Sequence, residues 1–252
     1  NSAEYYKAVF RLNPSQEETM IAKDALREIY IDNLGDATAY NSFIKSIPGM
    51  DIDNNLEEEN YYAVAKAKYD VGEWASAIEK YTFYLSNYPR GFRAPKARYE
   101  RAESYYSNKQ YDDAYGDIKE IIADNEEVYL ERALELALLI SYDYKKDFAA
   151  AYDFAQKLNE TTFNSMLKTK AQNYGLVAAY KIGNTTGVSK MARLLKQKCS
   201  DDRLVPVFVE DLFHEGNACE ALANRLLISR DNKTGEKHLK LGEETSFVVA
   251  LR

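Results

Sequence analysis

The sequence predicts an all-α protein built from repeated helix pairs, and three observations support this fold class. Apolar residues recur at intervals of three and four, as in Tyr61, Val64, Ala65 and Tyr69, which is the spacing of one helical face. Proline and glycine are sparse, with 5 and 11 in 252 residues, so few positions would interrupt a helix. Several residue types also return after 37 positions. The pattern therefore predicts a stack of like helical units.

The repeat is clearest at positions that would pack helices together. Ala77, Ala114 and Ala151 follow one another at intervals of 37, and an aromatic residue stands three positions before each of them. We expect small side chains where two helices approach closely, and aromatic rings where one helix covers another. The repeating sets are Trp74, Tyr111 and Phe148; Ala65, Ala102, Leu139 and Leu176; Ala67, Ser104, Ser141 and Ala178; and Tyr69, Tyr106, Asp143 and Tyr180. The fourth repeat departs from the pattern at Thr185 and Val188.

The residues before these repeats also predict a helix pair. Pro14 and Pro48 lie 34 residues apart, and between them the apolar spacing predicts two helices with a turn at Gly35. Ser15 followed by Glu18 predicts a capping box at the start of the first helix. The opening residues "NSAEYYKAVF" have the pattern of a helix already under way. We therefore expect the chain to be a piece of a longer polypeptide.

Each later repeat is predicted to be two helices joined by a tight turn. In the first of them, helices over 59–71 and 74–87 flank Gly72, because glycine tolerates the left-handed backbone that ends a helix. Lys109 and Lys146 stand at the same turn position in the next two repeats, and glycine returns at this position in the fourth. The turn chemistry therefore varies while the spacing is kept.

The predicted organisation has four regions. Residues 1–48 form an N-terminal set of helices, and residues 49–58 form an acidic linker whose Asp and Asn residues cap the next helix. The four repeats of period 37 occupy 59–198. Residues 199–252 are predicted to be an irregular insertion followed by a terminal helix pair, with a turn near Asp231.

Composition narrows the classes of function. With 46% hydrophobic and 29% charged residues, the chain has the composition of an ordinary globular protein. A net charge of -7 gives no basic face for nucleic acid, and no run of about 18 apolar residues would span a membrane. Cys199 and Cys219 are too few for a disulfide scaffold and too far apart for a paired metal motif, so they leave the redox compartment open.

The repeat residues resemble the tetratricopeptide repeat (TPR) family. The residues at matching offsets are Tyr61, Ala65, Gly72, Trp74, Ala77, Tyr81 and Pro89. The family period is about 34 residues, so the longer spacing around "RGFRAP" is a departure. This spacing and "YLSNYPRGFRAPKARYERAESYY" resemble TPR proteins of the Gram-negative cell envelope, such as outer-membrane-assembly lipoproteins and Tol-Pal accessory proteins. The resemblance implies a right-handed superhelix of antiparallel helix pairs and a periplasmic or outer-membrane-associated location.

The resemblance also implies a partner-binding face in the concave groove, formed by the first helix of each repeat. The positions carried over are Tyr62, Lys66, Tyr69, Asp70, Lys96, Tyr99, Glu103, Tyr106, Asp143, Tyr144, Asn173, Tyr180 and Lys181. Tyrosine gives a broad contact area and a hydroxyl at low entropic cost, which suits such a face. The alternative is that the tyrosines only cover seams between helices.

The sequence offers no site for chemistry. His214 and His238 lack a metal-ligand partner at helical spacing, and no P-loop, GxGxxG, GxSxG or HExxH motif occurs. We therefore predict no metal, no cofactor and no enzymatic activity. The basic cluster from Arg90 to Arg101 could bind an acidic terminus or phosphate, but Glu100 and Glu103 interleave with it, which favours an ordinary solvated helix face.

Two functions follow from this pattern. The first is a non-catalytic scaffold whose concave face binds a segment of a protein or peptide partner, with self-association also possible. The second is the helical recognition arm of a larger enzyme or of a glycan-handling system, because Tyr and Trp rings could stack on sugars. The parent chain would distinguish them: a catalytic domain after Arg252 favours the arm, and further repeats or a lipoprotein signal before Asn1 favour the scaffold.

Overall fold

The structure is a computed structural model that describes residues 2–184, 186–187, 190–191 and 194, and the backbone of 227–230, 237–241 and 245–249. The chain divides into two compact segments, which we call the N-terminal segment (Asn1–Tyr129) and the C-terminal segment (Leu130–Arg252) and describe separately. The predictions for Cys199, Cys219, His214, Thr185 and Val188 lie outside the described residues.

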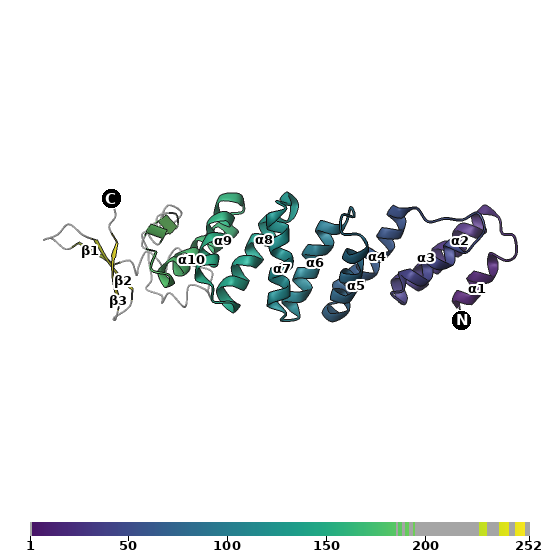
Figure 1. Cartoon of the computed structure of the whole chain (residues 1–252), viewed down its shortest axis with the longest axis horizontal. Coiled ribbons are helices and arrows are strands. Elements are labelled where there is room, and N and C mark those ends of the chain that lie inside the picture. Colours follow the sequence, from purple (N-terminus) through teal and green to yellow (C-terminus); the bar gives the residue numbers. More distant parts are fainter. Residues whose placement is uncertain are drawn as a thin grey trace. The chain divides into compact units, whose positions relative to one another are not determined.

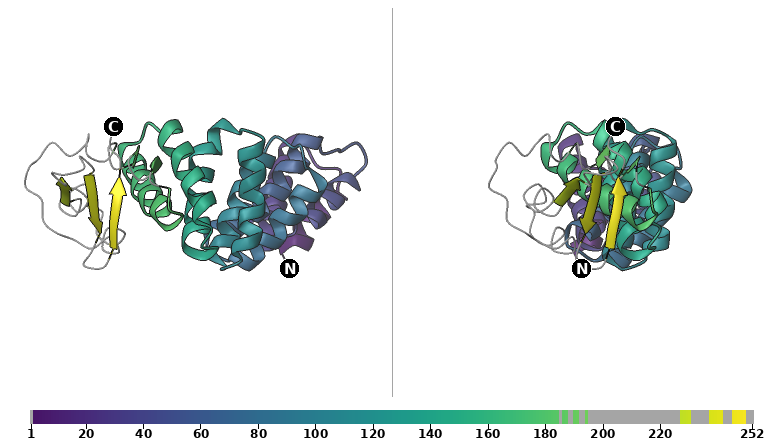
Figure 2. Two further views of the ribbon diagram at one scale, coloured as in Figure 1. Left: turned by 60° about the vertical axis from the view of Figure 1, so that its left-hand side comes forward. Right: turned by 90° about the vertical axis from the view of Figure 1, so that its left-hand side faces the viewer.

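The N-terminal segment is helical (Figure 1). Its elements are α1 (Ser2–Val9), α2 (Gln16–Arg27), the π-helix η1 (Glu28–Asn33), α3 (Ala37–Lys45), α4 (Asn54–Asp70), α5 (Trp74–Asn87), α6 (Ala94–Ser107) and α7 (Tyr111–Ala123). Figure 2 gives two further views, in which α4 to α7 lie side by side in chain order, as their mutual contacts also show. Adjacent helices in the sequence are thus adjacent in space.

The C-terminal segment begins inside a helix and contains helices followed by a small sheet. Its elements are α8 (Glu127–Leu139), the π-helix η2 (Ile140–Tyr144), α9 (Phe148–Thr161), α10 (Ser165–Lys181), β1 (Leu227–Arg230), β2 (Lys237–Leu241) and β3 (Thr245–Val249). Strands β1, β2 and β3 are antiparallel neighbours in that order. None of the described helices has an apolar stretch of the length that spanning a lipid bilayer requires.

The turns inside the helix pairs confirm the spacing of 37. Backbone φ is positive at five equivalent positions, namely Gly35 (65°), Gly72 (74°), Lys109 (63°), Lys146 (53°) and Gly183 (71°). Each lies 37 residues after the one before, so the first helix pair belongs to the same register as the later ones. The prediction had assigned that first pair by the 34-residue spacing of its prolines. The left-handed turn, rather than the proline, is the feature that repeats.

The alanines of the repeat occupy equivalent places. Ala77, Ala114 and Ala151 are each 0% exposed. Each backbone N–H donates to the carbonyl of the residue that precedes its helix, at 2.9, 3.0 and 2.9 Å respectively. Because these three residues have the same burial and the same hydrogen bond, the helix-pair unit predicted from the sequence is present in all three repeats. A larger side chain would not fit at these points.

The aromatic residue at the start of each second helix packs against a tyrosine of the first helix. The ring pairs are Tyr69 with Trp74 (5.7 Å), Tyr106 with Tyr111 (5.5 Å) and Tyr142 with Phe148 (5.3 Å), all edge to face. The sequence spacing had placed Asp143 in this column. The π-helix η2 adds one residue to the last turn, so Tyr142 meets the ring instead.

The start of α4 corrects the predicted linker over 49–58. The helix begins at Asn54, because the side chain of Asp53 accepts a hydrogen bond from the backbone N–H of Leu56. Capping by an Asp of this stretch was predicted and is confirmed, but the acidic residues that follow are helical. The capping box of Ser15 and Glu18 is also confirmed.

The terminal helix pair predicted within 199–252 is not what the structure shows. The described residues there form strands, with Leu227 paired to Lys240 and Lys237 paired to Val249. Short runs with β-branched residues, such as "TSFVV", are separated by Asp, Asn and Gly, which suits hairpins better than helices. Among the described residues, those between 2 and 194 agree with the all-α prediction, and those at 227–230, 237–241 and 245–249 do not.

Candidate binding surface

The first helices α4 and α6 carry eight of the predicted binding residues, and the structure brings these helices close to each other. Tyr62 and Tyr99 are buried, with 4% and 6% of their surface exposed. Tyr69, Lys66, Lys96, Glu103 and Tyr106 are half-buried, and Asp70 is exposed. The tyrosines are therefore not a simple exposed stripe.

One buried carboxylate links three helices. Glu100 of α6 is 6% exposed, and its Oε2 accepts hydrogen bonds from the hydroxyls of Tyr62 in α4 and Tyr81 in α5, both at 2.7 Å. A buried carboxylate is stable only when hydrogen bonds replace its hydration, and a buried phenol likewise requires an acceptor. The two phenols therefore supply the donors that the Glu100 carboxylate needs, and the carboxylate supplies the acceptor that each phenol needs.

A second carboxylate joins the predicted binding residues. Glu103 accepts from the Tyr69 hydroxyl at 2.6 Å through Oε2 and from the Tyr99 hydroxyl at 2.8 Å through Oε1. The ring of Tyr99 also stacks on Tyr129, with centroids 5.5 Å apart and planes at 22°. The structure thus brings Tyr69, Tyr99 and Glu103 together. They bind one another across α4 and α6.

A third carboxylate fixes the loop between α5 and α6. Glu58 of α4 accepts a hydrogen bond from the Tyr84 hydroxyl, and its Oε1 accepts from the backbone N–H of Arg93 at 3.2 Å. Gly91 lies against this pair, since a Cβ at this position would overlap both the Glu58 carboxylate and the Tyr84 hydroxyl. The glycine is thus required for close approach. We call the hydrogen bonds of Glu58, Glu100 and Glu103 the tyrosine–carboxylate network.

Four phenols of this network, those of Tyr62, Tyr69, Tyr81 and Tyr84, stay protonated well into the alkaline range. Burial is the largest cause of the raised pKa of Tyr62, Tyr69, Tyr81 and Tyr84, and a nearby carboxylate is the second. Both causes act in the same direction, because a phenolate would be poorly solvated and repelled by its neighbour. Each of these four phenols therefore remains a donor at physiological pH.

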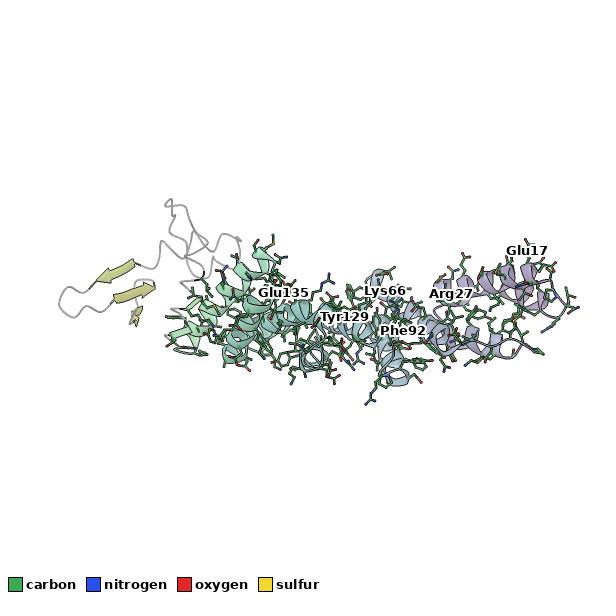
Figure 3. All side chains as sticks on the ribbon, turned by 90° about the horizontal axis from the view of Figure 1, so that it is seen from above. Glu17, Arg27, Lys66, Phe92, Tyr129 and Glu135 are labelled. Atoms are coloured by element: carbon green, nitrogen blue, oxygen red, sulfur yellow. The ribbon has the colours of Figure 1, made fainter. Side chains whose placement is uncertain are left out.

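Charged side chains cover the network on the outside. Lys66 forms an ion pair with Asp70, and Lys96 lies with its Nζ 3.9 Å from Glu100 and 5.5 Å from the ring centre of Tyr62. The guanidinium of Arg93 also lies over the Tyr62 ring, at 5.4 Å. Figure 3 shows the side chains along the ribbon, with Lys66 and Phe92 labelled. This layer is the accessible part of the predicted face.

The basic cluster around α6 is matched by carboxylates. The ion pairs are Arg93 with Glu59 (2.9 Å), Arg98 with Glu120 (3.0 Å) and Asp124 (3.8 Å), and Arg101 with Asp117 (2.6 Å). Arg101 donates hydrogen bonds from Nε and Nη2 to the two carboxylate oxygens of Asp117. This bidentate geometry is the strong form of an arginine–carboxylate pair. The structure therefore favours the helix-face interpretation of this cluster over an anion site.

The remaining predicted residues belong to the C-terminal segment. Tyr144 is 43% exposed, and burial raises the pKa of Asp143. Asn173 is 7% exposed, and its Oδ1 accepts no hydrogen bond from the described residues. Tyr180 is half-buried and Lys181 is exposed. Asp143 and Tyr144 belong to η2, and Asn173, Tyr180 and Lys181 belong to α10.

Sequence reasoning missed Glu58, Glu100, Tyr81 and Tyr84 as members of one network. A signal was present, because Tyr81 occupies the repeat position held by Ile118 and Ala155, and all three are 0% exposed. A tyrosine in a buried aliphatic column needs a polar partner. That partner was not identifiable by spacing, since Glu100 lies in the next repeat.

Comparison with known proteins does not add a family or a relative. No protein-family model matches the chain, and no curated protein matches it.

Proposed function

We propose that this chain is a non-catalytic protein–protein interaction scaffold of the TPR type, which binds a segment of a protein partner along α4 and α6. The observation that carries this proposal is the left-handed turn repeated at five positions 37 residues apart. A repeat array of this kind presents the same face of successive helices side by side, which gives an extended surface for a peptide or a helix.

The tyrosine–carboxylate network supports the choice of face. Glu100 and Glu103 tie α6 to α4 through phenol hydroxyls at 2.6 to 2.7 Å, so these two first helices are fixed relative to each other. A surface fixed before binding loses less conformational entropy when a partner arrives. Both signs of charge occur on it, at Lys66, Asp70 and Lys96, which suits a polar partner segment with mixed charge.

The location in our proposal is the periplasm or outer membrane of a Gram-negative bacterium. Its support is the sequence resemblance described above, in particular the residues from Tyr84 to Tyr106.

The test exchanges charge on the proposed face and on a control face. In the first variant, Lys66→Glu and Asp70→Lys reverse both members of an ion pair on α4. In the control variant, Asp113→Lys and Lys119→Glu make the same two changes at exposed positions of α7. Both variants keep the net charge, and circular dichroism with thermal melting checks that both remain folded.

The proteins retained from a Gram-negative envelope extract are then identified for each variant. We expect the α4 variant to lose at least one partner that the wild type and the α7 variant both retain. An identical set of retained proteins in all three would refute the assignment of the binding face to α4 and α6.

A further inference from the structure

The loop between α5 and α6 presents an aromatic side chain to solvent. Phe92 is 55% exposed, and it is labelled in Figure 3. The loop is nevertheless fixed on both sides of this residue. The backbone N–H of Ala94 donates to the carbonyl of Gly91 at 2.9 Å, and the backbone N–H of Arg93 donates to the Glu58 carboxylate at 3.2 Å. Phe92 is thus an exposed ring on a loop that hydrogen bonds hold in place.

The equivalent ring of the next repeat has a different contact. Tyr129 stands 37 residues after Phe92, and its ring stacks on Tyr99 with centroids 5.5 Å apart. Tyr62 is the residue equivalent to Tyr99. In this repeat the guanidinium of Arg93 lies over the Tyr62 ring at 5.4 Å and over the Phe92 ring at 5.1 Å. An arginine thus contacts Phe92 where a tyrosine contacts Tyr129.

The arginine that contacts Phe92 is itself held in position. The Nε and Nη2 atoms of Arg93 donate to the two carboxylate oxygens of Glu59 at 2.9 and 3.2 Å. The contacts of the guanidinium with two rings add to this bidentate pair. Rotation of the arginine away from Phe92 would break two hydrogen bonds, so the ring is placed before any partner arrives. A side chain placed in this way loses little conformational entropy on binding.

The charge left over around Phe92 is positive. Residues 90–96 contain three basic residues and no acidic one. Arg93 is paired with Glu59, and the arginines of α6 are paired as described above. Arg90 is exposed, and it forms no ion pair with any residue that the structure describes. Charge complementarity therefore favours a partner that brings a carboxylate to this loop.

We infer that Phe92 is an anchor residue of the proposed binding surface, and that the part of the partner that reaches it is an acidic segment with an apolar side chain. The apolar side chain packs on the exposed face of Phe92, and a neighbouring carboxylate pairs with Arg90. Aromatic residues and arginine are enriched in protein interfaces relative to the rest of the surface. The inference rests on the proposed function, and it extends the surface from α4 and α6 to the loop that precedes α6.

The probe is a fluorescein-labelled peptide with a leucine and a phenylalanine at its centre and acidic residues on both sides, and the receptor is the whole chain. Fluorescence anisotropy measures the affinity, and backbone amide shifts of Gly91 and Phe92 locate the peptide. We expect a Kd on the order of 0.1 to 1 mM, because one apolar contact and one ion pair form the interface. Alanines at the centre of the peptide, or lysines in place of its acidic residues, should each weaken binding at least about fivefold.

Matched variants test the two residues of the loop. Phe92→Ser and Arg90→Glu should each weaken peptide binding at least about fivefold, because each removes one of the two contacts. Phe92→Leu keeps an apolar surface and should weaken binding less than Phe92→Ser does. Val128→Ser and Lys119→Glu make the same kinds of change at other exposed positions of the N-terminal segment, and should leave binding unchanged.

The outcomes separate this inference from the proposed function. All of these variants change exposed side chains, and circular dichroism checks that each keeps the wild-type fold. Equal peptide binding by the wild type and Phe92→Ser, equal or tighter binding of the lysine peptide, or amide shifts confined to residues outside 88–96 would overturn the inference. The capture experiment changes Lys66 and Asp70 and leaves Phe92 in place, so its failure is a different result.

Discussion

Two helix pairs of the N-terminal segment fill the same core positions in different ways. The pair α4 and α5 places Tyr81 and Tyr84 where the pair α6 and α7 places Ile118 and Ile121, and all four residues are 0% exposed. The isoleucines need only packing, whereas the tyrosines need acceptors. The repeat backbone accommodates both solutions because Glu100 reaches into the first of these cores.

The difference shows where specificity enters a repeated fold. An aliphatic core is stable with any well-packed apolar neighbour, so it does not by itself select one partner helix or one register. The tyrosine–carboxylate network is satisfied in one arrangement only, since a phenol without its acceptor loses a buried hydrogen bond. We therefore expect the polar core to fix the register of α4, α5 and α6, and the aliphatic core to contribute mainly burial.

The largest expected effect comes from removing the shared carboxylate. Glu100→Ala leaves the hydroxyls of Tyr62 and Tyr81 buried without an acceptor, which should lower the free energy of unfolding by about 3 to 5 kcal/mol. Ile118→Val in the other core should cost only about 1 kcal/mol. Urea denaturation followed by circular dichroism measures both. Comparable losses for the two variants would remove the contrast between the cores.

We expect rising pH to destabilise the polar core of α4 and α5 at a lower pH than the aliphatic core of α6 and α7. The raised pKa of Tyr62 and Tyr81 means that the folded form keeps both phenols protonated where an unfolded phenol ionises, near pH 10. Their contribution to stability is therefore complete below about pH 10 and is lost as the pH rises beyond it. Burial raises the pKa of Tyr88 to about 12 in the same region.

Phenolate absorbance during a pH titration checks this prediction. We expect a group of tyrosines to ionise only together with the loss of helical circular dichroism. In a triple variant with Tyr62→Phe, Tyr81→Phe and Glu100→Leu, the absorbance change that accompanies the loss of helix should be smaller, because two of these phenols are absent. Ionisation of all tyrosines in one reversible step near pH 10, with the helices intact, would contradict the raised pKa values.

Two matched glycine substitutions test the comparison further, and we expect them to change stability by intermediate amounts. Gly91→Ala forces a Cβ into the Glu58 carboxylate and the Tyr84 hydroxyl, so we expect a loss of about 1 to 3 kcal/mol. Gly116→Ala lies within α7, where a Cβ meets nothing within 4 Å, and should stabilise by about 0.5 to 1 kcal/mol. Thermal melting of both variants gives the signs. A gain for Gly91→Ala like that expected for Gly116→Ala would show that the loop does not approach as closely as described.

The smallest expected effect concerns the turns that join the helices. Lys109 adopts φ of 63°, where Gly72 has 74°, and a side chain in this region costs roughly 1 to 2 kcal/mol. Lys109→Gly should therefore raise stability by about 0.5 to 1 kcal/mol after the added chain entropy is counted. Gly72→Ala should lower it by a similar amount. Differential scanning calorimetry resolves changes of this size, and no gain at Lys109 would indicate compensating contacts of its side chain.

The sequence was sufficient to predict the helix pairs and their spacing, because local chemistry determines both. Gly72 marks a left-handed turn, and Ala77 and Ala114 mark close approach. The π-helix η2 was not predictable, since its extra residue leaves the 37-residue spacing unchanged and only moves Tyr142 into the place expected for Asp143. The π-helical pattern of backbone hydrogen bonds causes this one-residue shift, and no residue type in the sequence indicates it.

The candidate surface was predictable only in part. The resemblance to TPR proteins had implied that Tyr69, Tyr99 and Glu103 share a face, and the structure brings these three residues together. The depth of Tyr62 did not, because its acceptor Glu100 lies 38 residues away and the two meet only after α4 and α6 pack. The prediction that this face binds a partner stays a prediction.

The three carboxylates of the tyrosine–carboxylate network have a mechanical consequence. In a stack of helix pairs each unit contacts only its neighbours, so small rotations between neighbouring units add up to bending. Glu58, Glu100 and Glu103 each bond across neighbouring elements, so rotation between α4, α5 and α6 would have to break several short bonds at once. Bending within the N-terminal segment should then concentrate at α1 to α3, and a partner lying on α4 and α6 would contact the more rigid part of this segment.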